Sequence, residues 1–414
     1  MKLRALVGIS VFWLALSMLS DGLNTLVLPF VFAGLLPDQQ QATALGLLTF
    51  TGIAAGMLIQ PLAGAWSDRL RARWGRRGGV LFGTLLTLLG LLAFSLGSTV
   101  AVIAAAYLLV QVFASTAQAA QQGFIPDLVP QPQRGRASGW KGMMDLGGAM
   151  LGFALLGQLL SQTGKNAAVL AIALAFAVTC GLTLLLVREP RQAASGAGAA
   201  AAPEEPRSTL QGSLFFRLVA ARFLFLLGTY AVGRFLLLFV ASRLGLSVEA
   251  AAAQAGALLA ALSLVTLLAA VPAGWAADRF GRPVLMTAGV LLSAVGILGL
   301  SAAAGQWGIL AGGGLMALGS AAFSSANWAM AADIAPAGAG GKFMGLANIG
   351  TAGASAAAGL FGPLVDAANR ASPNSGFLVV FGLAALITLS SLLVLRPLRR
   401  LMVVQNASRG EAWK

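Results

Sequence analysis

The sequence predicts an all-α polytopic membrane protein with twelve transmembrane helices, arranged as two pseudo-symmetric six-helix bundles. Three observations predict this fold class. Hydrophobic residues make up 58% of the 414 residues and charged residues only 10%, whereas a soluble domain has about 25% charged residues. Apolar runs of about 20 residues, long enough to cross a bilayer, recur along the whole chain. The basic residues are concentrated in the short segments between these runs, as the positive-inside rule describes.

Each apolar run is taken as one span. The first run follows Lys2 and Arg4 and continues to residue 36, which is too long for the apolar core of a signal peptide, so it is counted as a span. The twelve spans are expected at 6–36, 42–66, 78–97, 99–125, 138–160, 166–187, 214–241, 250–276, 283–304, 306–332, 343–365 and 375–395.

The longest break between spans divides them six and six. It contains the Ala-, Gly-, Pro- and Glu-rich stretch 193–206, which is typical of a flexible linker. The expected organisation is therefore an N-terminal six-helix bundle, a cytoplasmic linker, a C-terminal six-helix bundle and a cytoplasmic tail, at 1–187, 188–212, 213–396 and 397–414.

The distribution of charge predicts the orientation. Lysine and arginine number 27 and the formal net charge is +14. All but five of these basic residues fall on the side of the membrane that holds the N-terminus; the exceptions are Lys165, Arg243 and Arg370 opposite, and Arg222 and Arg234 within a span. Both termini and the linker should be cytoplasmic, in a bacterial inner (plasma) membrane. Basic residues placed in this way indicate contact with the lipid bilayer and not with nucleic acid.

The residue inventory excludes most enzyme chemistry. The chain has no histidine, and its one cysteine, Cys180, lies in an apolar run and is expected to be a buried apolar residue. No nucleophile–base set and no Gly-rich phosphate loop is found, which argues against a membrane enzyme and an ATP-driven pump. We expect neither a metal site nor an organic cofactor.

The two halves of the chain repeat one another. The segment from Gly64 to Arg69 matches the segment from Gly274 to Arg279 at an offset of 210, and Asp127 matches Asp333 at an offset of 206. Repeated halves with a binding site between them are the plan of many secondary transporters.

The repeated loop motif resembles that of a known family. Gly64…Asp68-Arg69…Gly75-Arg76-Arg77 and Gly274…Asp278-Arg279…Gly281-Arg282 are similar to the cytoplasmic loop motif of the major facilitator superfamily. The longer first copy resembles that of the glycoside-pentoside-hexuronide:cation symporters and the related sucrose-type carriers. Those proteins usually continue with Arg-Pro, where this chain has Gly78-Gly79.

The resemblance implies two bundles that rock about a central site, with helices 1, 4, 7 and 10 lining the cavity. It also implies a cytoplasmic gate that is held shut by charge-assisted hydrogen bonds, from Asp68, Arg69, Arg76, Asp278, Arg279 and Arg282. The alternative is that the arginines only set topology, which we favour for Arg71 and Arg73.

Four charged residues lie away from the ends of the spans, where each needs a partner or a watery cavity. They are Asp21, Asp145, Arg222 and Arg234. Asp21, and with it Asp145, are the candidates for binding a coupling proton or sodium ion. Simpler interpretations remain open: Asp21 as the structural partner of Arg222 or Arg234, Asp145 paired with Lys141 one turn away, and Arg222 extending to the membrane surface.

Polar residues on the cavity helices are the candidates for solute binding. Ser17, Asp21 and Asn24 have helical spacing and predict one polar stripe on helix 1. The full solute-binding set is Asn24, Gln118, Gln121, Gln122, Tyr230, Arg234, Asn327 and Trp328. The alternative is that these side chains join helices by hydrogen bonds.

The leading interpretation is a secondary active transporter that moves a small polar solute, such as a sugar or glycoside, coupled to protons or sodium. The alternatives are a proton-coupled exporter of lipophilic compounds and a carrier of an organic anion. We expect a monomer whose partners are its small-molecule substrate and the bilayer. Glycine pairs such as Gly148 and Gly152 are assigned to close helix packing.

Overall fold

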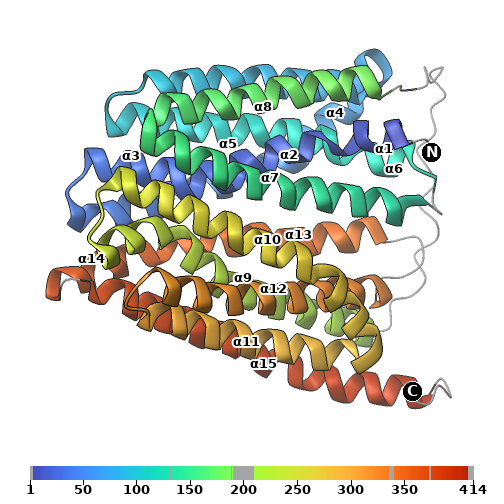
Figure 1. Ribbon diagram of the computed structural model, residues 1–414. Coiled ribbons are helices and arrows are strands. Elements are labelled where there is room, and N and C mark those ends of the chain that lie inside the picture. Colours follow the sequence, from blue (N-terminus) through green and yellow to red (C-terminus); the bar gives the residue numbers. More distant parts are fainter. Residues whose placement is uncertain are drawn as a thin grey trace. The chain divides into compact units, whose positions relative to one another are not determined.

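The computed structural model describes residues 3–130, 133–187, 189, 209–334, 340–372 and 374–408. Within these ranges it describes every side chain except those of 68, 70–74, 209–212, 332–347 and 397–408. All regular elements in the described ranges are helices (Figure 1). Eleven of them are long and apolar enough to cross a membrane, which confirms the all-α polytopic fold.

The N-terminal half contains six of these spans. The first is built from consecutive helical segments. The second and third are two helices that share the label α4 and meet at a kink at Gly75. The elements are α1 (Leu3–Ser10), α2 (Phe12–Ser17), η1 (Met18–Val27), α3 (Leu28–Leu35), α4 (Asp38–Leu96), α5 (Val100–Gln122), α6 (Phe124–Leu128), α7 (Arg134–Gln162) and α8 (Lys165–Leu186).

The C-terminal half contributes the other five. The predicted span 343–365 is not among them, since the side chains of its first part lie outside the described residues. The elements are α9 (Thr209–Leu244), α10 (Val248–Phe280), α11 (Arg282–Ala302), α12 (Gln306–Ile334), α13 (Gly340–Ala357), η3 (Ala358–Phe361), α14 (Gly362–Ala371) and α15 (Ser375–Ser408).

Glycines with positive φ mark the sharp turns between spans. Gly75 (φ 66°) breaks α4 between the second and third spans, and Gly164 (φ 83°) and Gly281 (φ 89°) precede α8 and α11. A side chain is strained at such φ values, whereas glycine adopts them freely. These are the positions at which the chain reverses direction.

By contacts the chain divides into two compact units. The first unit comprises 1–196, 234–264 and 359–374, and the second comprises 197–233, 265–358 and 375–414. The first unit thus combines the N-terminal six helices with parts of α9, α10 and the whole of α14. This division differs from the bundles expected at 1–187 and 213–396, which stay a prediction. The expected linker, 188–212, lies outside the described residues except for Glu189 and the backbone of 209–212.

Within the first unit α4 packs against both α5 and α8 (Figure 1). Glycines bring α7 close to the first span: a Cβ atom on Gly148 would lie 2.2 Å from the Leu14 carbonyl oxygen, and one on Gly152 would lie 3.1 Å from Met18. Small residues of this kind let helices approach closely in a membrane. The contact positions Asp145 of α7 against η1.

Within the second unit α11 packs against α12 and α15. The hydrophobic core there is centred on Phe225 of α9 and Phe323 of α12, whose rings stack with centroids 3.9 Å apart. This core fixes α9 beside α12 and so determines which polar residues of the two helices meet.

Candidate functional site

Asp21 lies in a π-helical stretch of the first span. The segment η1 (Met18–Val27) has π-helical geometry and contains both Asp21 and Asn24. Stretches of π-helix are rare in proteins, and those that occur are often found at functional sites. The prediction of one polar stripe assumed 3.6 residues per turn. In the structure Ser17 contacts α7 and Asn24 contacts α5, so the polar residues of this segment are shared between two neighbouring helices, and the single stripe stays a prediction.

Two carboxylates and one guanidinium come together in the first unit. Ser17 donates a hydrogen bond to the carboxylate of Asp145, and both Asp145 and Arg234 act electrostatically on Asp21. Asp21 and Asp145 are half-buried, and Arg234 is 5% exposed. The three groups come from η1, α7 and α9, and when ionised they sum to one negative charge. This group of residues is called the carboxylate cluster below.

Lys141 does not form the local pair with Asp145 that the sequence left open as an alternative. Its ammonium lies 3.8 Å from the centroid of the Trp13 ring, a cation–π contact. Among the described residues, no ion pair joins Lys141 to Asp145. The Asp145 carboxylate is therefore free of Lys141, and it accepts the hydrogen bond from Ser17 and interacts electrostatically with Asp21.

Asn24 belongs to a neutral network beside the cluster. Its Oδ1 accepts hydrogen bonds from Tyr107 Oη (2.7 Å) and Gln111 Nε2 (3.3 Å), and Gln111 also donates to Tyr107 Oη (2.6 Å). All three residues are buried. The sequence interpretation placed Gln111 in the helix-4 stripe but did not single out Tyr107, because a tyrosine in an apolar run gives no signal of its own.

Two glutamines of α5 form hydrogen bonds to other helices. Gln118 accepts a hydrogen bond from Gln60 Nε2 (3.1 Å), and Gln121, 1% exposed, donates to the Ile9 carbonyl (2.9 Å). Gln122 is exposed. This geometry favours the helix-joining interpretation for Gln118 and Gln121.

A second polar cluster is built on α9, α12 and α13 in the second unit. Arg222 is 6% exposed and donates from Nε to Thr351 Oγ1 (2.9 Å) and from Nη1 to Asn327 Oδ1 (3.1 Å). Its guanidinium carbon lies 4.3 Å from the centroid of the Trp328 ring. Half-buried Tyr230 lies within electrostatic reach. This group is called the arginine cluster. The idea that Arg222 extends to the membrane surface was wrong, because the side chain is engaged by neighbouring helices.

The loop after the second span is anchored within the first unit. Arg76 forms an ion pair with Asp127, and the Glu189 carboxylate accepts from the backbone N–H groups of Arg76 (2.9 Å) and Arg77 (2.8 Å). Arg77 donates to the Leu184 carbonyl. Asp127 entered the sequence interpretation only through its motif, and Glu189 was missed because it lies in the linker region.

The second copy of the loop motif has a similar anchor. Arg282 donates to the Ala329 carbonyl on α12 (3.0 Å), while Asp278 and Arg279 are exposed and Arg279 lies over Trp275. Arg69 is exposed, and the side chain of Asp68 lies outside the described residues. The expected gate across the two halves therefore stays a prediction.

A buried carboxylate that the sequence interpretation missed joins the two halves of the sequence. Asp366 of α14, 2% exposed, accepts from the backbone N–H groups of Thr43 (2.6 Å) and Ala42 (3.3 Å) in α4. A Cβ atom on Gly46 would lie 2.0 Å from the Gly359 carbonyl oxygen. The two segments thus pack backbone against backbone. This group, called the Asp366 contact, lies wholly within the first unit.

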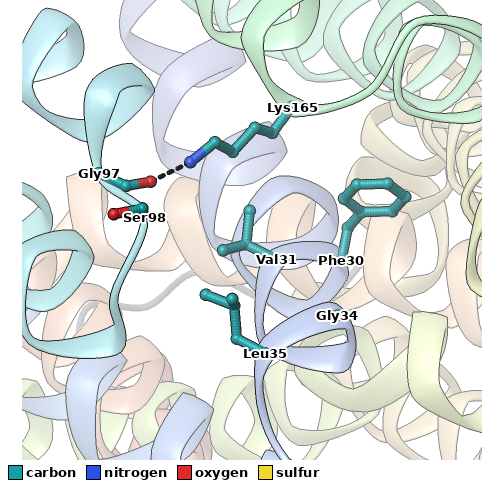
Figure 2. A pocket seen from close by; sticks show the side chains of 7 residues that line it. All are labelled: Phe30, Val31, Gly34, Leu35, Gly97, Ser98 and Lys165. Carbon is teal, nitrogen blue, oxygen red and sulfur yellow. Dashed lines mark hydrogen bonds between the residues drawn. The ribbon is translucent and has the colours of Figure 1, made fainter.

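A small pocket of about 230 Å³ lies apart from these clusters. Figure 2 shows Lys165 reaching from α8 to the carbonyl of Gly97, which ends α4. The lining is mostly apolar, and its one charged group is occupied by that carbonyl. Its residues are Phe30, Val31, Gly34, Leu35, Gly97, Ser98 and Lys165.

The family follows from comparison of the whole chain. The sequence profile of the Major Facilitator Superfamily matches residues 5–254 and 230–414. The chain belongs to this superfamily. It is a membrane transporter and not an enzyme. Comparison with the curated proteins finds no match in sequence.

Solved structures of two transporters share the fold. One is a bacterial homolog of the human lysosomal transporter Spinster, in an inward-facing, unoccupied conformation: TM-score 0.71, 13% identity, 100% of this chain and 99% of that one covered. The other is the peptide transporter POT in complex with sulfate: TM-score 0.71, 14% identity, 96% and 95% covered. At these identities the likeness shows the fold alone.

Proposed function

We propose that this superfamily member is a secondary active transporter that moves a small polar, hydroxylated solute by alternating access and is driven by protons or sodium. The observation that carries the proposal is the carboxylate cluster. Asp21, Asp145 and Arg234 come from three different helices and sum to one negative charge in a membrane-spanning region. Charged side chains within spans mark ion pathways and proton relays.

The negative charge of the carboxylate cluster can couple the binding of a cation to the conformation of the protein. An uncompensated negative charge is costly in a membrane interior, so a bound proton or sodium ion lowers the free energy of this region. The cation therefore favours conformations that bury the cluster, and its release favours those that hydrate it. A solute bound only in one of these states then moves with the cation, since a ligand shifts an equilibrium by its differential affinity.

The solute class and setting are proposed on the sequence. Neutral amides, hydroxyls and an indole ring on the expected cavity helices suit a hydroxylated solute, as does the resemblance of the first loop to the glycoside-pentoside-hexuronide:cation symporters. The distribution of basic residues supports a bacterial inner membrane and cytoplasmic termini. The protein is proposed to act as a monomer, with no cofactor beyond the coupling ion.

Uptake into proteoliposomes tests the proposal. With the purified protein reconstituted, an inward proton or sodium gradient should drive labelled sugars or sugar acids to an internal concentration above the external one. An ionophore that collapses the gradient should return the solute to equilibrium, and protein-free liposomes serve as the control. Uptake that never exceeds equilibrium, or movement restricted to lipophilic cations, would contradict the proposal.

A further inference from the structure

We propose that the arginine cluster binds an anionic group, a carboxylate, of the transported solute. The inference rests on the proposed function, and it narrows the solute from a hydroxylated compound to a hydroxylated acid. Three features support it: the contacts of Arg222, the unused donor of Asn327, and the setting of both residues in the second unit.

Among the side chains that the structure describes, Arg222 is a buried cation without a counter-ion. It is 6% exposed in a membrane span, and both of its hydrogen-bond acceptors, Thr351 Oγ1 and Asn327 Oδ1, are neutral. Among the described carboxylates none forms an ion pair with it, and the group that acts on it electrostatically is the Tyr230 hydroxyl. Burying a charge unpaired is costly, so proteins rarely keep one without a function.

Asn327 adds a second unused donor. The residue is 1% exposed, its Oδ1 accepts from Arg222, and its Nδ2 has no hydrogen-bond partner among the described residues. A buried donor left unsatisfied costs about 1–3 kcal/mol. A guanidinium carries five N–H donors, and the described residues accept from two of those on Arg222. Free donors on adjacent cationic and amide groups require an acceptor, and a carboxylate has two oxygens that accept such bonds.

The setting fixes these donors in place. Trp328 covers the guanidinium at 4.3 Å, which holds its plane, and Trp328 itself packs against the core that contains the stacked Phe225 and Phe323. Arg222 therefore needs little rearrangement to bind an anion, and a preorganised site loses less entropy on binding. Trp328 is half-buried at the edge of the cluster, where the apolar body of the acid can contact it.

Thermal unfolding of the purified protein in detergent tests the inference without any transport. The probes are sodium acetate and sodium glucuronate, compared with sodium chloride at equal ionic strength and with glucose. The wild type should unfold about 2 °C or more higher in 100 mM of a carboxylate salt than in chloride, because a ligand that binds only the folded state stabilises it. Arg222→Met should lose this shift. The matched control Arg217→Met, an exposed arginine on the same helix, should keep it.

The same variants separate a binding role from a structural one. If Arg222 only joins helices, Arg222→Met should unfold below the wild type in chloride. If Arg222 instead forms an anion-binding site, Arg222→Met should unfold at the same temperature as the wild type or higher, because an uncompensated buried charge has been removed. Asn327→Asp places a carboxylate 3.1 Å from Nη1; it should raise the unfolding temperature in chloride and abolish the response to carboxylates.

Two results would overturn the inference: equal unfolding temperatures of the wild type in chloride and carboxylate salts, or an undiminished carboxylate shift in Arg222→Met. Neither result bears on coupled transport, which is measured by uptake against a gradient. Conversely, a carboxylate shift in a protein that never accumulates solute would leave the anion site standing and would refute the proposed function alone.

Discussion

Replacing Asp21 with asparagine should abolish accumulation of solute against a gradient and leave exchange of solute across the membrane intact. Asparagine keeps the size of the side chain and removes its charge. The side chain at position 21 can then no longer be ionised beside Asp145 and Arg234. The variant then has no proton or sodium to release, and accumulation should fall to the equilibrium level. Counterflow of labelled solute, which needs no net ion movement, should retain most of its wild-type rate.

The matched control is Glu249→Gln. Glu249 is an exposed carboxylate in the first turn of α10, and its replacement should leave both accumulation and counterflow unchanged. An Asp21→Asn protein that still accumulates solute to the wild-type ratio would refute the coupling role. Loss of counterflow together with accumulation would place Asp21 in solute binding instead.

Replacing Asp366 with alanine should destabilise the closed contact between α4 and α14. The carboxylate accepts two backbone hydrogen bonds in a site that is 2% exposed. A hydrogen bond to a charged group contributes about 1.5–3 kcal/mol, and each 1.4 kcal/mol is a factor of ten in an equilibrium constant. Alanine should therefore raise the population in which the two segments separate by about tenfold or more, and should slow coupled uptake to a similar extent.

Cysteine labelling measures this separation. In a Cys180→Ser background, Thr43→Cys places a half-buried thiol beside the contact. A membrane-impermeant maleimide should modify it about tenfold faster when Asp366 is alanine, and asparagine, which keeps one acceptor, should give an intermediate rate. Labelling of Ser98→Cys, an exposed position, should not change. Equal labelling of Thr43→Cys with aspartate or alanine at 366 would show that the contact does not limit opening.

The helical fold could be predicted from the sequence because its determinants are local. An apolar run long enough to cross a bilayer specifies a helix whatever surrounds it, since every backbone polar group must be satisfied within the segment. The repeated loop motifs likewise identified Arg76 and Arg282, and each is anchored by its own unit. The predicted span 343–365 was harder to delimit, because the chain there passes from α13 through η3 into α14.

The polar contacts could be predicted only in part, because they depend on packing. Asp21, Asp145 and Arg234 stood out as ionisable residues in apolar runs, but helical periodicity cannot show the π-helical stretch that turns Asn24 toward Tyr107. The pairing of Asp366 with Thr43 joins residues 323 positions apart. The sequence around Asp366, near the end of a predicted span, does not indicate such a partner.

The depth of Arg222 illustrates the same limit. Its position toward one end of a predicted span suggested a side chain that reaches the membrane surface. The structure instead surrounds it with Asn327, Trp328 and Thr351 from two other helices. Helix packing, and not distance from the end of the span, determines the surroundings of a long side chain.

If solute and cation move together, entry of solute alone must drive movement of the ion. Proteoliposomes are prepared with no ion gradient, a solute that the protein transports is added outside, and the interior is followed with a pH-sensitive dye or by uptake of labelled sodium. Downhill solute entry should carry protons or sodium inward in the wild type and not in Asp21→Asn. Solute entry with no movement of either ion would contradict coupled transport.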